Sequence, residues 1–333
     1  MNISIIGSED SGKDLFFEIL SEGKYTKSGK NLIGSVNVPD PRIDILSDFF
    51  KPKKTIYAKI NFKCLSIKPN LPIEDLRTSD ELIIVLKYLE NGINDAESVV
   101  AEFNDIIVSL QINDLEIIEN YIKRHEKEPK SDKDIVLLNK IKEVIEKEQI
   151  AENIKLFEND LIRGLGLVSV KQKLVVLNIP ENLIKPNEIV DRMKKDIKNY
   201  ETLTISIDLE KEIVSLDLQA RLEMFKAYSI EESSLDVIIK KSFELLNLIT
   251  FFTVGEDEVR GWILDKGSNA LEAAGKIHSD IQRGFIRAET INYTDFLNCS
   301  FSFKEAKEKG LLKLEGKEYV VKHGDIMHFR FNV

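Results

Sequence analysis

The segment Gly7-Ser-Glu-Asp-Ser-Gly12-Lys13 has the spacing of a phosphate-binding loop, G-x-x-x-x-G-K. Such a loop directs backbone N–H groups and a helix N-terminus at phosphate oxygens, and its lysine adds a positive charge. Because an apolar run precedes it and residues at helical spacing follow, the required order of strand, loop and helix is present. The motif predicts a nucleotide site formed by Gly7, Asp10, Ser11, Gly12, Lys13, Asp14 and Leu15.

Asp14 stands where this motif normally has Ser or Thr, whose hydroxyl binds Mg²⁺. Together with Glu9 and Asp10, it surrounds the lysine with carboxylates. A carboxylate about 4 Å from a phosphate charge costs on the order of 4 kcal/mol at an effective dielectric constant of about 20. Two interpretations stay open. The loop is either a structural relic or weak binder, or a useful nucleotide site in which Asp14 binds Mg²⁺ directly.

The composition narrows the class of protein. The chain has 333 residues, long enough for two or three domains, and a net charge of −10, which argues against nucleic acid wrapped over the whole surface. Cys64 and Cys299 have no CxxC spacing, and the histidines form no metal-binding pattern. The N-terminus does not read as a signal peptide and no run approaches a membrane span. We expect a cytoplasmic protein with neither membrane nor DNA as a partner.

The phosphate loop requires a parallel sheet behind it. Apolar runs typical of buried strands occur at 81–89 and 173–178, a run that alternates like a strand occurs at 57–62, and a short strand is expected at 202–207; helical stretches separate them. This alternation predicts an α/β fold with a mostly parallel sheet. Between Gly92 and Gly164, apolar residues follow one helical stripe on each side of Pro129, which predicts a hairpin of two long helices that turns at 127–132. This hairpin is either a plain spacer or an arm that binds a partner.

The sequence pattern changes near residue 248, from long helical stretches to short runs separated by glycines. From there to Val333, glycines recur between short alternating runs, which is typical of a small mixed-sheet module. The predicted division is therefore a sheet domain over 1–93 and 166–247, a helical hairpin inserted over 94–165, and a C-terminal module over 248–333.

Several segments resemble the YchF family of GTPase-fold ATPases related to Obg. They include Val38-Pro-Asp-Pro-Arg42-Ile-Asp44, Leu248-Ile-Thr-Phe-Phe252, Arg283-Gly-Phe-Ile-Arg-Ala-Glu289 and Gly324-Asp-Ile-Met-His-Phe-Arg-Phe-Asn-Val333. The resemblance implies a P-loop G domain, an inserted coiled-coil hairpin and a C-terminal TGS domain of β-grasp type. It also implies ATP or GTP as ligand, ribosome or ribosomal RNA as partner, and a role in translation.

The nucleotide motifs of the family are kept unevenly. The resemblance places base recognition, N-x-x-E, at Asn178 and Glu181, and the last motif at Ser206-Ile-Asp208, where it is not kept. The metal-binding D-x-x-G motif falls at Cys64 to Ile67, so Cys64 replaces the aspartate. Tyr25 to Ser35 contains no counterpart of the first switch, and Lys68 to Pro72 replaces the second.

These losses affect the parts that phosphoryl transfer needs, namely Mg²⁺, its ligands and the mobile switches. We therefore expect a pseudo-GTPase or pseudo-ATPase that binds nucleotide weakly, if at all, with little role for Mg²⁺. It would act as a ribosome-associated binding protein through its hairpin and TGS domain, with RNA or partner contacts at Arg283, Arg287, Lys322 and Arg330. Two alternatives stay open: a divergent ATPase or GTPase, and a module that pairs with a G-domain homologue.

Overall fold

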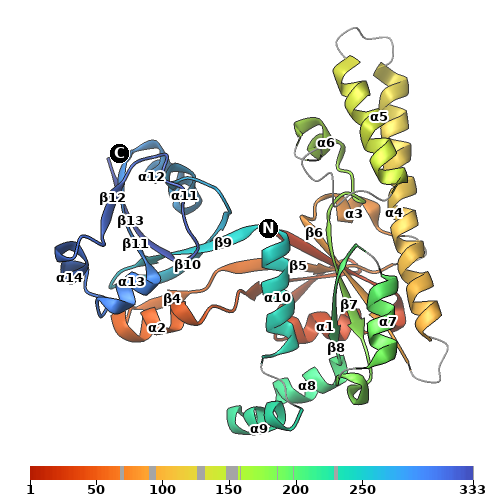
Figure 1. The fold of residues 1–333 in the computed structure, drawn as a ribbon, viewed down its shortest axis with the longest axis horizontal. Coiled ribbons are helices and arrows are strands. Elements are labelled where there is room, and N and C mark those ends of the chain that lie inside the picture. The colour runs from red at the N-terminus through yellow and green to blue at the C-terminus, as the bar shows by residue number, and fades with distance from the viewer. Residues whose placement is uncertain are drawn as a thin grey trace. The chain divides into compact units, whose positions relative to one another are not determined.

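A computed structural model describes residues 1–67, 71–89, 95–125, 132–147, 157, 159–185, 187–197, 199–228 and 232–332. The chain divides into two compact units (Figure 1). Unit 1 comprises Met1–Ser35 and Asn61–Leu235, and unit 2 comprises Val36–Ile60 and Asp236–Val333.

Unit 1 is built on a sheet whose strand order is β2-β3-β5-β1-β6-β7-β8. Strands β5, β1, β6, β7 and β8 pair in parallel, and β2 is antiparallel to β3. Because β6 is buried from end to end apart from Lys87, it lies at the centre of a covered sheet. The strands are β1 (Asn2–Ile6), β2 (Tyr25–Ser28), β3 (Asn31–Asn37), β5 (Lys59–Cys64), β6 (Glu81–Lys87), β7 (Gln172–Asn178) and β8 (Glu201–Ile205).

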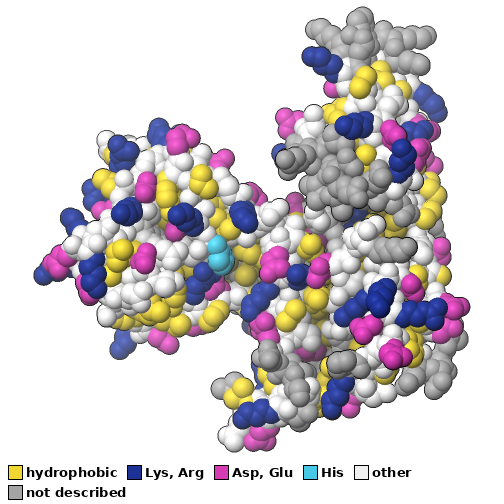
Figure 2. All heavy atoms as spheres, viewed as in Figure 1, with side chains coloured by type: hydrophobic (Ala, Val, Ile, Leu, Met, Phe, Trp, Pro, Cys, Tyr) yellow, Lys and Arg dark blue, Asp and Glu magenta, His cyan; other side chains and the backbone are white. Residues whose placement is uncertain are grey.

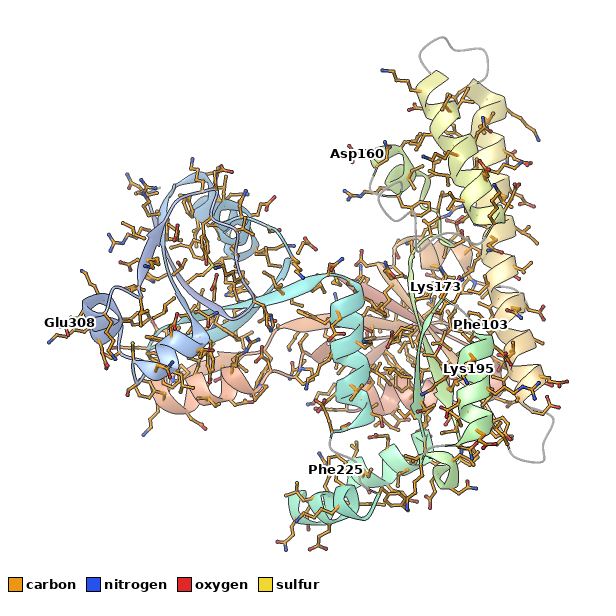
Figure 3. All side chains as sticks on the ribbon, in the orientation of Figure 1. Phe103, Asp160, Lys173, Lys195, Phe225 and Glu308 are labelled. Carbon is orange, nitrogen blue, oxygen red and sulfur yellow. The ribbon has the colours of Figure 1, made fainter. Side chains whose placement is uncertain are left out.

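Helices cover this sheet. Buried side chains of α4 and α7 pack with those of β6 and β7 in one cluster, to which Phe103 of α4, labelled in Figure 3, contributes. Helix α1 packs against α8. The helical elements of this part of the chain are η1 (Glu9–Ser11), α1 (Lys13–Leu20), α3 (Ile73–Arg77), α4 (Ala96–His125), α5 (Asp132–Glu146), α6 (Asp160–Leu165), η3 (Glu181–Leu183), α7 (Glu188–Asp196), α8 (Ile207–Ser215) and α9 (Leu218–Tyr228).

The predicted helical hairpin is present. Helix α4 has 30 residues and α5 has 15, and the two run side by side in Figure 1. Ile118 of α4 and Leu138 and Ile141 of α5 share one buried cluster, which is the apolar stripe that the sequence shows. The turn expected at 127–132 lies outside the described residues except for Asp132.

Unit 2 contains the expected β-grasp sheet, with strand order β12-β11-β13-β9-β10-β4. Helix α11 packs on one face through Ala273 and Ala274, while α2, α13 and α14 pack on the other. The strands are β4 (Lys54–Ile56), β9 (Leu248–Val254), β10 (Glu258–Asp265), β11 (Phe285–Asn292), β12 (Lys313–Glu315) and β13 (Asp325–Phe331). The helices are α2 (Pro41–Phe50), α10 (Ser234–Leu245), α11 (Ala270–Ile277), α12 (Ser279–Arg283), α13 (Tyr293–Asn298) and α14 (Phe303–Glu308).

The compact units differ from the division that the sequence predicted. Val36–Ile60 belongs to unit 2, although the prediction placed it in the first part of the G domain. The physical reason is long-range pairing: β4 joins the unit 2 sheet beside β10, and Ile43 and Leu46 of α2 are buried in a cluster with Phe252. Unit 2 also resumes at Asp236 on α10, ahead of the predicted boundary at 248.

Candidate nucleotide site

The phosphate-loop segment connects β1 to α1, as the motif requires. The surroundings of its two glycines leave no room for a side chain. A Cβ atom on Gly7 would lie 2.3 Å from the carbonyl oxygen of Val85. Gly12 has φ +85°, and a Cβ atom there would lie 2.8 Å from Nδ2 of Asn178. The loop therefore keeps the close backbone approach that phosphate binding uses, and larger residues do not fit at either position.

Helix α1 begins at Lys13 and directs its first turn at the loop. The amides of Asp14 and Leu15 have no hydrogen-bond partner among the described residues, as expected for the first turn of a helix. Three amides of the motif are already engaged: that of Ser8 donates to Oε1 of Glu102 at 3.3 Å, that of Ser11 donates to the carbonyl of Ser8, and that of Lys13 donates to Oγ of Ser11 at 3.3 Å. Anion-binding capacity thus remains at the start of α1.

The loop lysine has a carboxylate as its neighbour. The Lys13 side chain is only 3% exposed, and its Nζ lies 3.4 Å from both carboxylate oxygens of Asp14. The Asp14 side chain is 65% exposed, and Glu9 and Asp10 are exposed as well. Because Asp14 partly offsets the charge of Lys13, the loop attracts phosphate less than a loop whose only charge is its lysine.

Cys64, at the end of β5, lies beside Asp14. Its Sγ is 3.3 Å from Oδ1 of Asp14. Burial raises the pKa of the Cys64 thiol, and the negative charge of Asp14 raises it further, so the group stays protonated and donates to the carboxylate. Compared with a magnesium-binding P-loop, the carboxylate has moved from the strand end to the helix start.

These donors do not fit Mg²⁺ in the usual arrangement, which takes a hydroxyl from the loop and an aspartate from the neighbouring strand. A protonated thiol is a poor ligand for this hard cation. In the part of the chain that the structure describes, no group of three or more His, Cys, Asp or Glu side chains is arranged to hold a metal ion. At the two positions where the family pattern has a hydroxyl and an aspartate, the site therefore offers a single carboxylate, that of Asp14, beside the thiol of Cys64.

Asn178 at the end of β7 joins two loops of the site. Its Nδ2 donates to the carbonyl of Ser11 at 3.1 Å, and its Oδ1 accepts from the amide of Ile207 at 3.2 Å. The side chain is 7% exposed. An amide nitrogen carries two hydrogens, and among the described residues only one of those of Asn178 has an acceptor. The segment Ser206–Asp208, which lacks the residues of the family's last motif, is thus connected to the site by the backbone amide of Ile207.

Glu181 is the second predicted base-recognition residue, and it is exposed on η3. Its Oε1 accepts a hydrogen bond of 3.1 Å from the hydroxyl of Tyr228 on α9. The bond and the negative charge raise the pKa of Tyr228. The sequence analysis missed Tyr228 and Glu102, because no local signal links them to the loop, from which they are distant in the chain.

The segment expected to hold the first switch is an antiparallel hairpin. Tyr25 of β2 pairs with Gly34 of β3, and the turn includes Gly29 at φ +63°. A hydrogen-bonded hairpin fixes its backbone, unlike a loop that must rearrange around a phosphate. Most of the segment that replaces the second switch, 68–70, lies outside the described residues.

The four basic residues predicted to contact RNA or a partner lie in unit 2, but not as one cluster of unpaired charge. Arg283 forms an ion pair with Asp280, and Arg330 forms one with Glu289. Arg287 is exposed and lies opposite Arg330 in the register of the antiparallel strands β11 and β13. Lys322 is also exposed. On the face seen in Figure 2, basic and acidic side chains of unit 2 are interspersed.

A family model named YchF-GTPase_C, described as a protein of unknown function (DUF933), matches residues 248–332. The chain is 34% identical to the ribosome-binding ATPase YchF of Bacillus subtilis, covering 100% of both chains. It is 31% identical to the protein of the same name from Escherichia coli O157:H7, covering 99% of this chain and 98% of the relative.

Solved structures show the same fold. The YchF GTPase of Schizosaccharomyces pombe superimposes with a TM-score of 0.86 at 24% identity, covering 99% of this chain and 97% of the other. A GTP-binding protein from Pyrococcus horikoshii gives a TM-score of 0.65 at 17% identity over the full length of both. Among the helices described, none is long and apolar enough to cross a membrane. With its P-loop G domain, inserted hairpin and C-terminal β-grasp domain, the chain belongs to the YchF family.

Proposed function

We propose that this chain is a nucleotide-binding, ribosome-associated member of its family that does not hydrolyse nucleotide. The observation that carries the proposal is the exchanged pair at the phosphate loop, with the carboxylate on Asp14 and a protonated thiol on Cys64. Hydrolysis in P-loop proteins depends on a metal ion bridging the phosphates and on segments that rearrange around them. The exchanged pair and the β2–β3 hairpin support the loss of both.

Binding itself is supported by what the loop retains. The glycine geometry, the first-turn amides of α1, Lys13 and the N–H of Asn178 that has no acceptor among the described residues are groups that can recognise a phosphate and a base. The ligand is ATP or GTP, and the Asp14 carboxylate keeps the affinity low. One unfavourable carboxylate–phosphate pair, at about 4 kcal/mol, weakens binding by roughly three decades.

Association with the ribosome is supported by the relatives, which are named ribosome-binding ATPases. Unit 2 carries exposed Arg287 and Lys322, for which the described residues provide no ion pair, and positive side chains of this kind contact RNA phosphates. The surface of the α4–α5 hairpin is a second candidate contact. We place this activity in the cytoplasm.

A steady-state turnover assay tests the proposal. Purified chain is incubated with ATP or GTP and Mg²⁺ beside the Lys13→Ala variant, and calorimetry of the same samples measures binding. The proposal expects binding that Lys13→Ala weakens, and phosphate release equal to that of the variant. Release above the variant would show a divergent ATPase, a candidate that the 65% exposure of Asp14 favours because an exposed carboxylate is accessible to a cation.

Pull-down from a lysate separates the two partner classes. Recovery of ribosomal proteins with the full chain supports ribosome association. Recovery of a G-domain homologue without ribosomal proteins would instead assign a pairing role, and the ribosome part of the proposal would fail.

A further inference from the structure

Unit 2 contains a cavity of about 660 Å³ that the nucleotide chemistry does not use. Buried apolar side chains form much of its wall, among them Val38, Phe243, Leu248 and Ile249. This volume lies within the range of about 300–1,000 Å³ that is typical of sites for small organic molecules. Its polar wall includes Asp40, Arg42 and His323, together with Lys240, Glu244, Asn247, Thr250 and Lys266.

Arg42 connects these polar groups. Its Nε and one terminal nitrogen donate to the two carboxylate oxygens of Asp40, at 2.8 and 2.7 Å. That same terminal nitrogen lies 2.7 Å from Nε2 of His323, which is 281 positions further along the chain. Asp40 and Arg42 belong to the segment that joins unit 2 from within the G domain, so the contact ties this segment to the C-terminal domain.

The hydrogen count at His323 leaves one donor too many. Its Nδ1 accepts the amide hydrogen of Thr250 at 3.1 Å, and a backbone amide can only donate. Burial lowers the pKa of His323, and the charge of Arg42 lowers it further, which favours a neutral ring with one acceptor nitrogen for two facing donors; with Nδ1 accepting from Thr250, the hydrogen lies on Nε2. This N–H then faces the guanidinium of Arg42, which has only donors.

Two donors that face each other at 2.7 Å without an acceptor between them are an unfavourable arrangement. An oxygen atom placed beside both nitrogens would accept from each of them. A negatively charged oxygen fits best, because the Arg42 charge is shared with a single carboxylate and Lys266, exposed at the cavity, has no ion pair among the described residues. Glu244, the other acid of the wall, is paired with Lys241.

We propose that this cavity is a binding site for a small amphipathic anion. A carboxylate or phosphate oxygen of the ligand accepts from Arg42 and His323, and its apolar body lies against Val38, Phe243, Leu248 and Ile249. The site is independent of the phosphate loop, because every residue of its wall lies in unit 2.

A matched pair of fluorescent probes tests the proposal on the full chain. Anilinonaphthalene sulfonate carries an anionic group, and phenylnaphthylamine has the same aromatic body without the charge. The anionic probe is expected to bind about tenfold more tightly than the neutral one, since one charge-assisted hydrogen bond accounts for that ratio. Equal binding of the two probes, or tighter binding of the neutral one, would overturn the proposal.

Variants locate the effect. His323→Leu is expected to abolish the preference for the anionic probe, and Lys266→Met to reduce it. Lys317→Met, at an exposed lysine of unit 2 that does not line the cavity, is expected to leave it unchanged. If His323→Leu does not fold, Lys266→Met decides, because its exposed side chain does not support the fold. An unchanged preference in Lys266→Met would contradict the assigned site.

Competition identifies the ligand group. Decanoate supplies a carboxylate and phenyl phosphate supplies a phosphate, each on an apolar body. Displacement of the anionic probe by either one supports the proposal and selects the headgroup. Failure of both to displace it would overturn the assignment of an anion site.

Discussion

The thiol of Cys64 lies 3.3 Å from Oδ1 of Asp14, so a hydrogen bond joins the end of β5 to the start of α1. Its donor is on the strand and its acceptor is on the helix. In a magnesium-binding P-loop the helix carries the hydroxyl and the strand carries the carboxylate. Here the helix carries the carboxylate and the strand carries the donor. The pair keeps its local contact while the metal loses one of its usual ligands.

The reciprocal exchange Asp14→Ser with Cys64→Asp is expected to make nucleotide affinity depend on Mg²⁺. It returns the hydroxyl to the helix and the carboxylate to the strand. We expect ATP to bind at least about tenfold more tightly to the double variant with Mg²⁺ than without it. Calorimetric titration with and without chelator measures this ratio.

The single variants provide the control. Asp14→Ser alone leaves no carboxylate for the metal, and Cys64→Asp alone places two carboxylates side by side, which weakens nucleotide binding. The two changes should therefore be non-additive, with a coupling of about 1 kcal/mol or more. Additive effects would show that the two positions do not act as a pair.

Asn178→Ala is expected to destabilise the fold by about 1–3 kcal/mol, because it leaves the carbonyl of Ser11 and the amide of Ile207 without their partner in a buried place. Urea denaturation measures this loss. Glu181→Gln serves as the matched control, since Glu181 is exposed and its one described bond, from Tyr228, can be made to an amide oxygen. A stable Asn178→Ala variant would show that the bridge does not hold the loop.

The fold was predictable where the signal is local. The apolar run before Gly7, the helical stripes around Pro129 and the glycine-punctuated C-terminal region each predict an element from adjacent residues. The position of Val36–Ile60 was not, because three residues of β4 join the unit 2 sheet through their pairing with β10, some 200 positions away.

The candidate site shows the same limit. Gly12, Lys13 and Asp14 are adjacent in sequence, so their spacing reveals a phosphate loop. The bond from Asn178 to Ser11 forms because the carboxyl ends of parallel strands meet at one edge of the sheet. The contact between Arg42 and His323 has no such rule, and only the folded chain reveals it.

Lys173, labelled in Figure 3, gives unit 1 a stability that depends on pH. Burial lowers its pKa from 10.5 to about 7. Because the folded state binds the proton less well than the unfolded state, the stability contributed by this group rises as the pH increases from about 7 towards 10 and is constant at its lower level below about pH 7, where both states hold the proton. Its Nζ donates to the carbonyls of Ser169 and Lys171.

The test compares the chain with Lys173→Met, which cannot be charged. Urea denaturation at about pH 6 and about pH 9 should show the difference in unfolding free energy shifting in favour of the native lysine at the higher pH. Comparison with the variant removes the contribution of Lys171, whose pKa burial lowers to about 8. A pH-independent difference would contradict the assignment.

Arg287→Glu is expected to weaken co-sedimentation with ribosomes roughly fivefold, equivalent to about 1 kcal/mol, because it reverses an exposed charge beside Arg330. The effect should shrink as salt is raised. Lys226→Glu, at an exposed lysine of α9, is the control that should leave co-sedimentation unchanged. Equal binding of Arg287→Glu and the unaltered chain would exclude this face of unit 2.

The most direct test of the nucleotide account is the magnesium dependence of ATP binding to the unaltered chain. Nucleotide-free protein is titrated with ATP by calorimetry, once with Mg²⁺ and once with chelator, beside Lys13→Ala. Weak binding of equal affinity in both conditions, lost in Lys13→Ala, is the predicted result. An affinity that rises about tenfold or more with Mg²⁺ would contradict the account, because Asp14 would then be serving as a metal ligand.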